Sequence, residues 1–199
     1  MSIVLFVSQT VFADSLKIRD FFVSMPDTIL PVMEKRDRLD LLDMYDAIQY
    51  AGEDGDGNID VSDRRLSFLY TLASHVEMVM FTHKTDTVLS LIHTFNTSVP
   101  LSVISFYSTE WQRIVDESLC PMPSLRNFVK KEYAKNDSIR LLENSIPLDS
   151  YIIEADTLGQ SLWFKYTGNA FLSVEDSVRF LNWFTEQPVE LRWNGKRFK

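Results

Sequence analysis

The stretch GEDGDGNID, residues 52–60, carries the residue types of a calcium loop. An EF-hand loop supplies oxygen ligands from positions 1, 3, 5, 7, 9 and 12, with glycine at position 6 for the sharp turn. When Gly57 is set at position 6, position 1 is Gly52, which has no side-chain ligand. The remaining carboxylates fall on ligand positions and belong to Asp54, Asp56, Asp60 and Asp63. Because position 1 lacks a ligand and no second loop pairs with this one, the sequence favours an acidic connector without a cofactor, and a weak calcium site formed by these four aspartates is the alternative.

Other residues give no recognisable catalytic or metal-binding motif. The three histidines, His75, His83 and His93, lack the close spacing of zinc ligands. His93 alternates with apolar residues, which indicates a position in the core. The motifs of nucleophilic hydrolases, phosphate-binding loops and redox dithiols are absent from the sequence. We assign no catalytic or cofactor-binding residue, and a carboxylate pair from distant positions is the alternative.

Aromatic residues gather in the last third of the chain. The tryptophans there are Trp163, Trp183 and Trp193, and they are accompanied by Phe164, Tyr166, Phe184 and Phe198. Exposed rings of this kind can form a platform that binds a glycan or a peptide. Aromatic residues at alternating or helical spacing are more often buried, so a place in the core is the alternative interpretation.

Seven of the 17 aspartates are followed by Ser or Thr. Such pairs are common in turns and helix caps, which is one explanation of the bias. The pattern of Asp, Ser or Thr and then an apolar residue also resembles the O-glycosylation acceptor of exported Bacteroidetes proteins. On that interpretation Thr87 and Thr157, which lie in predicted turns, are the expected acceptors.

The composition of the whole chain restricts its partners. Of 199 residues 45% are hydrophobic, which is enough for a core, and the formal net charge is −8. Nucleic acids and anionic membrane surfaces are bound by clustered Lys and Arg, so we expect an unknown protein or glycan partner instead. After the N-terminus no segment is apolar enough to span a membrane. Cys120 is the only cysteine, which excludes an internal disulfide.

The N-terminus, MSIVLFVSQTVFADS, has the apolar run and the final alanine of a signal peptide. No Lys or Arg precedes the run, which departs from the usual pattern. The alternative is a buried first strand formed by IVLFV. We expect residues 1–13 to be a signal peptide and residues 14–199 to be one exported domain, periplasmic or secreted.

These candidate residues must be positioned by helices and strands that the sequence also indicates. Residues 14–50 are helical in character, divided by Pro26 and Pro31, and the last piece places Leu39, Leu42, Tyr45 and Ile48 on one face. From residue 64 onward HVEMVMFT and TVLSLIHTF flank a turn at residues 83–86, and PLSVISFY follows. These patterns predict strands that pair in an antiparallel sheet.

A second set of elements follows a polar, helix-like segment over residues 124–143. DSYIIEAD and SLWFKYT predict strands, and Ser173 caps a helix with Val174, Val178, Leu181 and Phe184 along one side. Asn194-Gly195 predicts a terminal two-residue hairpin. The sequence therefore predicts an α+β fold, N-terminal helices followed by antiparallel sheet, which could form two halves of helices and strands.

Four blocks of sequence resemble an exported Bacteroidales family of uncharacterised proteins, domain of unknown function family 3256. The blocks are FFVSMPDTILPVMEKRDRLDLLDMYDA, VISFYSTEW, FLSVED and LRWNGKRF, which are spread through nearly the whole mature chain. The resemblance implies export and a domain of helices and sheet, with no established activity and no functional residue to carry over. The GEDGDGNID loop lies outside these blocks.

Together these observations predict an exported, non-catalytic binding or interaction module of the cell envelope. The expected binding surface is the face of the sheet or the aromatic C-terminal third. A small hydrolase or glycan-processing enzyme with a dispersed carboxylate pair is the alternative, and a calcium-stabilised module is a second one. An enzyme would have a cleft that holds two convergent acidic side chains, which distinguishes it from a binding module.

Overall fold

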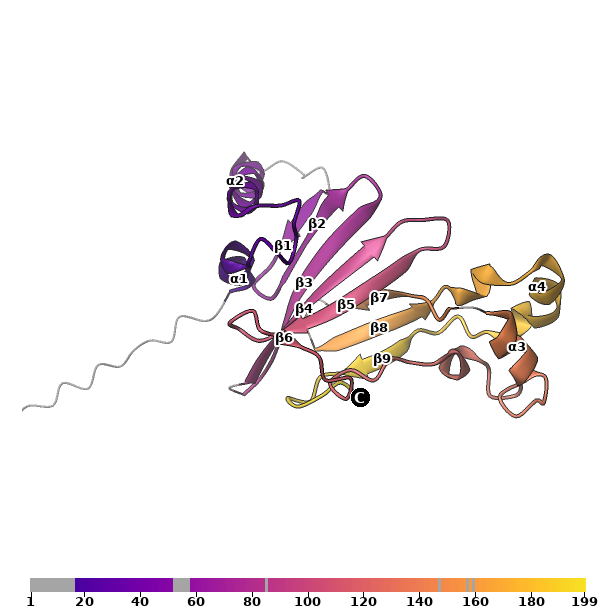
Figure 1. Ribbon diagram of the computed structural model, residues 1–199. Helices are drawn as coiled ribbons and strands as arrows, with labels where there is room; N and C mark the ends of the chain where they lie inside the picture. Colours follow the sequence, from indigo (N-terminus) through magenta and orange to yellow (C-terminus); the bar gives the residue numbers. More distant parts are fainter. Residues whose placement is uncertain (1–16, 52–57, 85, 147, 157, 159) are drawn as a thin grey trace, which may run out of the picture.

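The computed structural model describes residues 17–51, 58–84, 86–146, 148–156, 158 and 160–199. The predicted signal peptide lies outside them. In this part of the chain two antiparallel sheets, of six and three strands, combine with short helices, which confirms the predicted α+β fold (Figure 1). No described helix has both the length and the apolar character needed to cross a bilayer.

The first part of the chain forms two helices and the larger sheet, in which each strand pairs with the preceding one. The helices confirm the prediction that two proline-separated pieces precede the sheet. The elements are α1 (Ile18–Ser24), α2 (Lys35–Ala51), β1 (Ile59–Val61), β2 (Arg65–Thr71), β3 (Ser74–His83), β4 (Asp86–Phe95), β5 (Leu101–Tyr107) and β6 (Arg113–Ile114).

The second part forms a small helical region and the smaller sheet, in the order β7-β8-β9. Its helices lie at the end of the molecule far from α1 and α2 (Figure 1). The elements are η1 (Leu125–Phe128), α3 (Ile139–Ser145), β7 (Tyr151–Ala155), β8 (Ser161–Tyr166), η2 (Gly168–Phe171), α4 (Val174–Phe180), η3 (Leu181–Trp183) and β9 (Val189–Arg192).

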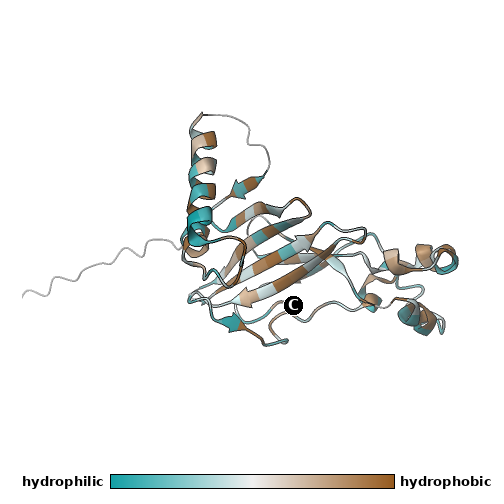
Figure 2. Cartoon of the chain, turned by 45° about the horizontal axis from the view of Figure 1, so that its top comes forward, coloured by the Kyte–Doolittle hydropathy of each residue, from teal (hydrophilic) through white to brown (hydrophobic). Residues whose placement is uncertain are grey.

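The central hairpin of β3 and β4 has two buried faces, because the larger sheet is covered on both sides. Val76 and Met78 pack in one core with α1 and α2, while Val79 and Phe81 pack in a second core with the smaller sheet. Successive residues of a strand point to opposite faces, so a strand covered on both sides needs apolar residues at nearly every position. Figure 2 shows this concentration of hydrophobic residues along the strands.

A buried arginine fixes the connection between α1 and α2. Arg38 is 1% exposed and donates hydrogen bonds to the carbonyl oxygens of Met33 at 2.8 Å and Met25 at 2.5 Å. It also pairs with Asp27 at 2.9 Å. Leu39, predicted on the buried face of α2, is instead 41% exposed. Residues spaced by three drift around a helix of 3.6 residues per turn, and Arg38 occupies the inward position.

The C-terminal hairpin closes the second core. Its turn lies one residue later than predicted: Asn194 N–H donates to the carbonyl of Arg197 at 3.2 Å, so Gly195 and Lys196 are central. Gly195 has φ +91° and occupies the first central position, where a type II′ turn needs glycine. Beyond the turn Phe198 is fully buried.

The prediction of which side of α4 faces the core was wrong. Val174, Val178 and Leu181 are 85%, 81% and 61% exposed, whereas Phe180 is fully buried. The capping prediction is confirmed, since Ser173 accepts a hydrogen bond from the backbone N–H of Asp176. The helix has only seven residues, so the packing of one large ring decides which side faces the core.

Candidate functional site

The described residues of the acidic loop do not form a metal site. Asp60 lies in β1 and pairs with Arg65 at 2.9 Å, while the backbone carbonyl of Asp63 accepts from Ile18 N–H at 3.0 Å. Within the described ranges, no group of His, Cys, Asp and Glu could hold a metal ion. A strand, rather than the exit helix of an EF-hand, follows at β2. Asp54 and Asp56 lie outside the described residues, so calcium binding stays a prediction.

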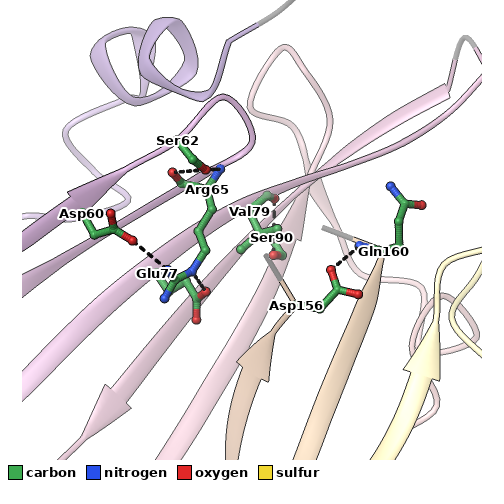
Figure 3. A network of polar contacts seen from close by, with 8 residues as sticks. All are labelled: Asp60, Ser62, Arg65, Glu77, Val79, Ser90, Asp156 and Gln160. Atoms are coloured by element: carbon green, nitrogen blue, oxygen red, sulfur yellow. Dashed lines mark hydrogen bonds and ion pairs between the residues drawn. The ribbon is translucent and has the colours of Figure 1, made fainter. Parts of the chain in front are cut away.

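Arg65 joins two carboxylates at the edge of the larger sheet (Figure 3). Its guanidinium contacts Asp60 on β1 and Glu77 on β3, and Glu77 is only 3% exposed. Burial alone would lower the pKa of Arg65, but the two carboxylates outweigh it and hold that pKa above the ordinary value. The buried charge is therefore compensated. Both carboxylates of this cluster are engaged by the guanidinium of Arg65.

Burial determines the protonation of both His93 and Cys120. His93 stacks on Phe95 with ring centroids 4.2 Å apart and meets Tyr70 edge-on at 5.1 Å. Burial and then the nearby His75 lower its pKa, so the ring is neutral at pH 7. Burial raises the pKa of Cys120 to about 12, which keeps the thiol protonated and unreactive.

The three tryptophans of the predicted platform lie in three environments. Trp193 is 9% exposed and packs on Phe198 in the second core. Trp183 is half-buried and stacks on Tyr133 at 4.9 Å. Trp163 is half-buried in the middle of the smaller sheet, on the face opposite the second core. No ring contact joins the three within the part of the chain described.

Of the two predicted glycosylation acceptors, Thr87 lies among the described residues and Thr157 does not. Thr87 lies in β4 rather than in a turn, directly opposite Thr82, with the hydroxyl oxygens 3.4 Å apart. It is half-buried. Thr157 lies outside the described residues. Modification of either residue stays a prediction.

A cavity of about 950 Å³ lies where β8 ends, beside the segment that leads from η3 into β9. We call it the aromatic pocket. Its lining combines two aromatic rings, two lysines, four neutral polar residues, one acid and one leucine: Lys130, Lys165, Tyr166, Asn169, Leu181, Asn182, Phe184, Thr185, Glu186 and Gln187. The pocket is large enough for a ligand of several rings.

Two rings of a three-ring stack, Tyr166 and Phe184, line the aromatic pocket, and the third ring, Phe128, is buried behind them. Tyr166 lies between Phe128, at 5.0 Å, and Phe184, at 5.6 Å, with nearly parallel planes. Burial, followed by the charge and the hydrogen bond of Asp149, raises the pKa of Tyr166, whose hydroxyl donates to Asp149 Oδ1 at 3.1 Å. Gly168 is needed here, because a Cβ at this position would lie 2.6 Å from Tyr166 Cζ.

Backbone pairing between distant segments positions the rest of the pocket. Lys130 N–H donates to the carbonyl of Trp183 at 2.8 Å, and Thr185 N–H donates to the carbonyl of Phe128 at 2.8 Å. These bonds hold Lys130 against the segment that carries the polar lining residues. Lys165 arrives from β8, two residues after Trp163 and on the same face of the sheet.

The sequence predicted a role for the aromatic residues of the last third of the chain, but it did not predict the pocket. Tyr166 and Phe184 belong to the predicted aromatic group, yet they act as a wall rather than as an exposed platform. Lys130 and the polar residues between 182 and 187 carried no motif that could have identified them. These residues have in common only that they lie close together in the folded chain.

The chain is similar to a protein family and to a solved domain, both without a known function. A family model described as "Protein of unknown function (DUF3256)" matches residues 8–198. A solved domain of an uncharacterised protein from Porphyromonas gingivalis W83 has a similar fold, with a TM-score of 0.74. The two share 18% sequence identity, over 91% of this chain and 96% of that one. No curated protein matches the chain.

Proposed function

The chain belongs to the DUF3256 family of proteins of unknown function, and we propose that it is a non-catalytic binding module of the cell envelope that holds its ligand in the aromatic pocket. Export is proposed from residues 1–13, which have the character of a signal peptide. The proposal of binding rests on one observation, the combination of ring faces and polar side chains in a cavity of about 950 Å³.

The chemistry of the lining supports a glycan more than an apolar ligand. The face of Phe184 that is turned away from Tyr166 can pack on the C–H groups of a sugar ring, and Tyr166 supports Phe184 from behind. Amide side chains both donate and accept hydrogen bonds, which suits the hydroxyl groups of a sugar. The lining amides are Asn169, Asn182 and Gln187.

The same lining favours binding over hydrolysis. Glycosidases act with two carboxyl groups on opposite sides of the scissile bond. Among the residues that line the aromatic pocket, Glu186 is the single acid. Tyr166 keeps its proton because its pKa is raised, so it is unsuited to act as a base. The pocket is therefore equipped to hold a sugar and lacks the paired acids that would cleave it.

Binding of the full chain to an array of glycans and peptides tests this function. We expect at least one glycan to bind, and we expect Asn182→Ala with Gln187→Ala to lower its affinity about thirtyfold, since each lost hydrogen bond costs about 1 kcal/mol. Both side chains are exposed, so the thermal midpoint should not change.

A matched variant, Asn96→Ala with Gln112→Ala, removes two exposed amides that do not line the pocket and should bind like the native chain. Equal loss of affinity in both double variants would contradict the assignment of the pocket. Release of reducing ends from the bound glycan would contradict a non-catalytic role.

A further inference from the structure

We infer that the ligand is an acidic carbohydrate, a sugar that carries a carboxylate or a phosphate, held by Lys130 and Lys165 in the aromatic pocket. This inference rests on the proposed function and specifies the class of ligand. Its physical basis is a local excess of positive charge in a protein that is acidic as a whole.

The first observation is that the pocket has two lysines and one acid. Lys130 and Lys165 are exposed, and neither forms an ion pair with any residue that the structure describes. By contrast, Arg126 nearby is already engaged with Glu143, with nitrogen–oxygen distances of 2.7 and 3.0 Å. Two unpaired ammonium groups that line one cavity both attract an anion that binds in it.

The second observation is the charge of the segment that supplies Lys130. Residues 126–140 contain five basic side chains, Arg126, Lys130, Lys131, Lys135 and Arg140, against Glu132 and Asp137, a net charge of +3. The formal net charge of the whole chain is −8. A second cavity, of about 430 Å³, is lined by Arg126, Lys135 and Arg140 of the same segment. The segment that supplies Lys130 is therefore basic, while nearby acids such as Glu143 and Glu186 limit the excess of positive charge to this segment and to the two lysines of the pocket.

The rest of the lining distinguishes an acidic sugar from a simple anion. A bare phosphate or sulfate site is typically built from backbone N–H groups or arginine forks. Here the charges stand beside two aromatic rings and three amides, which match a ring with C–H faces and hydroxyl groups. The two lysines then recognise the charged substituent, and the amides recognise the hydroxyl pattern.

Isothermal titration of the full chain with three probes tests the inference. Trigalacturonate carries a carboxylate on each ring, galactotriose is its neutral counterpart, and mannose 6-phosphate presents a phosphate. We expect at least one acidic probe to bind about tenfold more tightly than galactotriose at low salt, because hydrogen bonds to charged groups are the stronger ones. The preference should shrink at about 1 M salt, where screening is nearly complete.

Variants separate the charge from the rest of the site. Lys130→Met with Lys165→Met should remove the preference for acidic probes and leave the affinity for galactotriose unchanged. The control, Lys196→Met with Lys199→Met, removes the same charge outside the pocket and should keep the preference. Asn182→Ala with Gln187→Ala should weaken acidic and neutral sugars alike.

The outcomes distinguish this inference from the function on which it rests. If galactotriose binds as tightly as the acidic probes and the amide variant weakens it, the pocket binds sugars but the acidic class is wrong. If the control pair abolishes the preference as fully as the pocket pair, general charge explains the preference and the assignment of the lysines is wrong. If no probe binds, the acidic class is rejected, and the array of glycans and peptides then decides the function separately.

Discussion

Buried polar side chains in this protein differ in how well they are compensated. Arg38 has two carbonyl acceptors and an ion pair, and Glu77 has the guanidinium of Arg65. Arg38 keeps these partners although its buried Nε has no hydrogen-bond partner among the described residues, whereas the buried Nε2 of His93 is also unpaired and no ion pair with His93 is found there. An unpaired polar atom away from water costs stability, and a charged form would cost more. His93 is therefore kept neutral, as its lowered pKa indicates.

Replacement of His93 by Phe should raise stability and change its dependence on pH. The pKa of His93 is lowered in the folded state, so the unfolded chain binds the proton more readily. Native stability is therefore complete above the unfolded pKa of about 6.5 and is lost as the pH falls toward the folded pKa. His93→Phe should remove that loss, which we expect to be below about 1 kcal/mol because solvent reaches part of the ring.

Urea unfolding of the native chain and the variant at several values between pH 5 and 8 measures the effect. His83 is exposed, so His83→Gln serves as a control and should keep the native slope. Parallel curves for the native chain and His93→Phe would contradict the account of His93.

At the scale of elements, the predictions from sequence were right where turn, cap or breaker residues determine the local structure. The hairpin between β3 and β4, the cap at Ser173 and the helices separated by prolines all follow from turn, cap and breaker residues. The orientation of α4 and the exact turn of the last hairpin did not follow. They depend on Phe180, which packs with Leu125, Val129 and Leu142 in a third core, and on the close approach of Gly195 to His83. Both contacts join residues far apart in the chain.

Gly195→Ala should destabilise the protein more than an ordinary surface change. A Cβ at this position would lie 2.9 Å from His83 Cβ, and the φ of +91° is strained for any side chain. We expect a loss of about 2–4 kcal/mol, from the left-handed backbone and the steric contact together. Thermal or urea unfolding measures the loss.

Two further variants separate the backbone cost of Gly195→Ala from its steric cost. His83→Gly in the same background removes the neighbour and should restore the steric part, while the backbone cost remains. Lys196→Ala, the adjacent turn residue without positive φ, should change stability by less than about 0.5 kcal/mol. A Gly195→Ala variant as stable as Lys196→Ala would show that the turn tolerates a side chain.

At the scale of the whole molecule, charge and function are distributed unevenly. The N-terminal helices and the larger sheet form one end, and the small helical region with the aromatic pocket lies at the other (Figure 1). The second core joins the two sheets through Phe81, Phe106 and Phe198, whose rings are in contact. Tyr166 and Phe184 both line the pocket and pack against this core, so the pocket wall is anchored to the core that joins the sheets.

Calcium binding by the acidic loop is also tested on the whole molecule. A ligand that binds only the native state raises stability by mass action, by about 1.4 kcal/mol at ten times its Kd. For a chain of this size that corresponds to about 3–6 °C in the thermal midpoint. We expect a weak site to show this rise in millimolar calcium relative to EDTA, and Asp54→Ala with Asp56→Ala to abolish it. An unchanged midpoint would leave the loop as an acidic connector.

The sequence by itself determined the α+β class, most helices and strands, the family and the aromatic C-terminal region. These depend on periodicity, turn chemistry and ordered blocks of residues, which are local or one-dimensional properties. Only the tertiary structure decided that Trp193 is buried and that Lys130, Lys165 and Phe184 line one cavity. Those residues come from three separate segments, and backbone hydrogen bonds between residues 128–130 and 183–185 bring two of the segments together. Because such long-range pairing leaves no periodic signal, a pocket of this kind becomes visible only after the chain has folded.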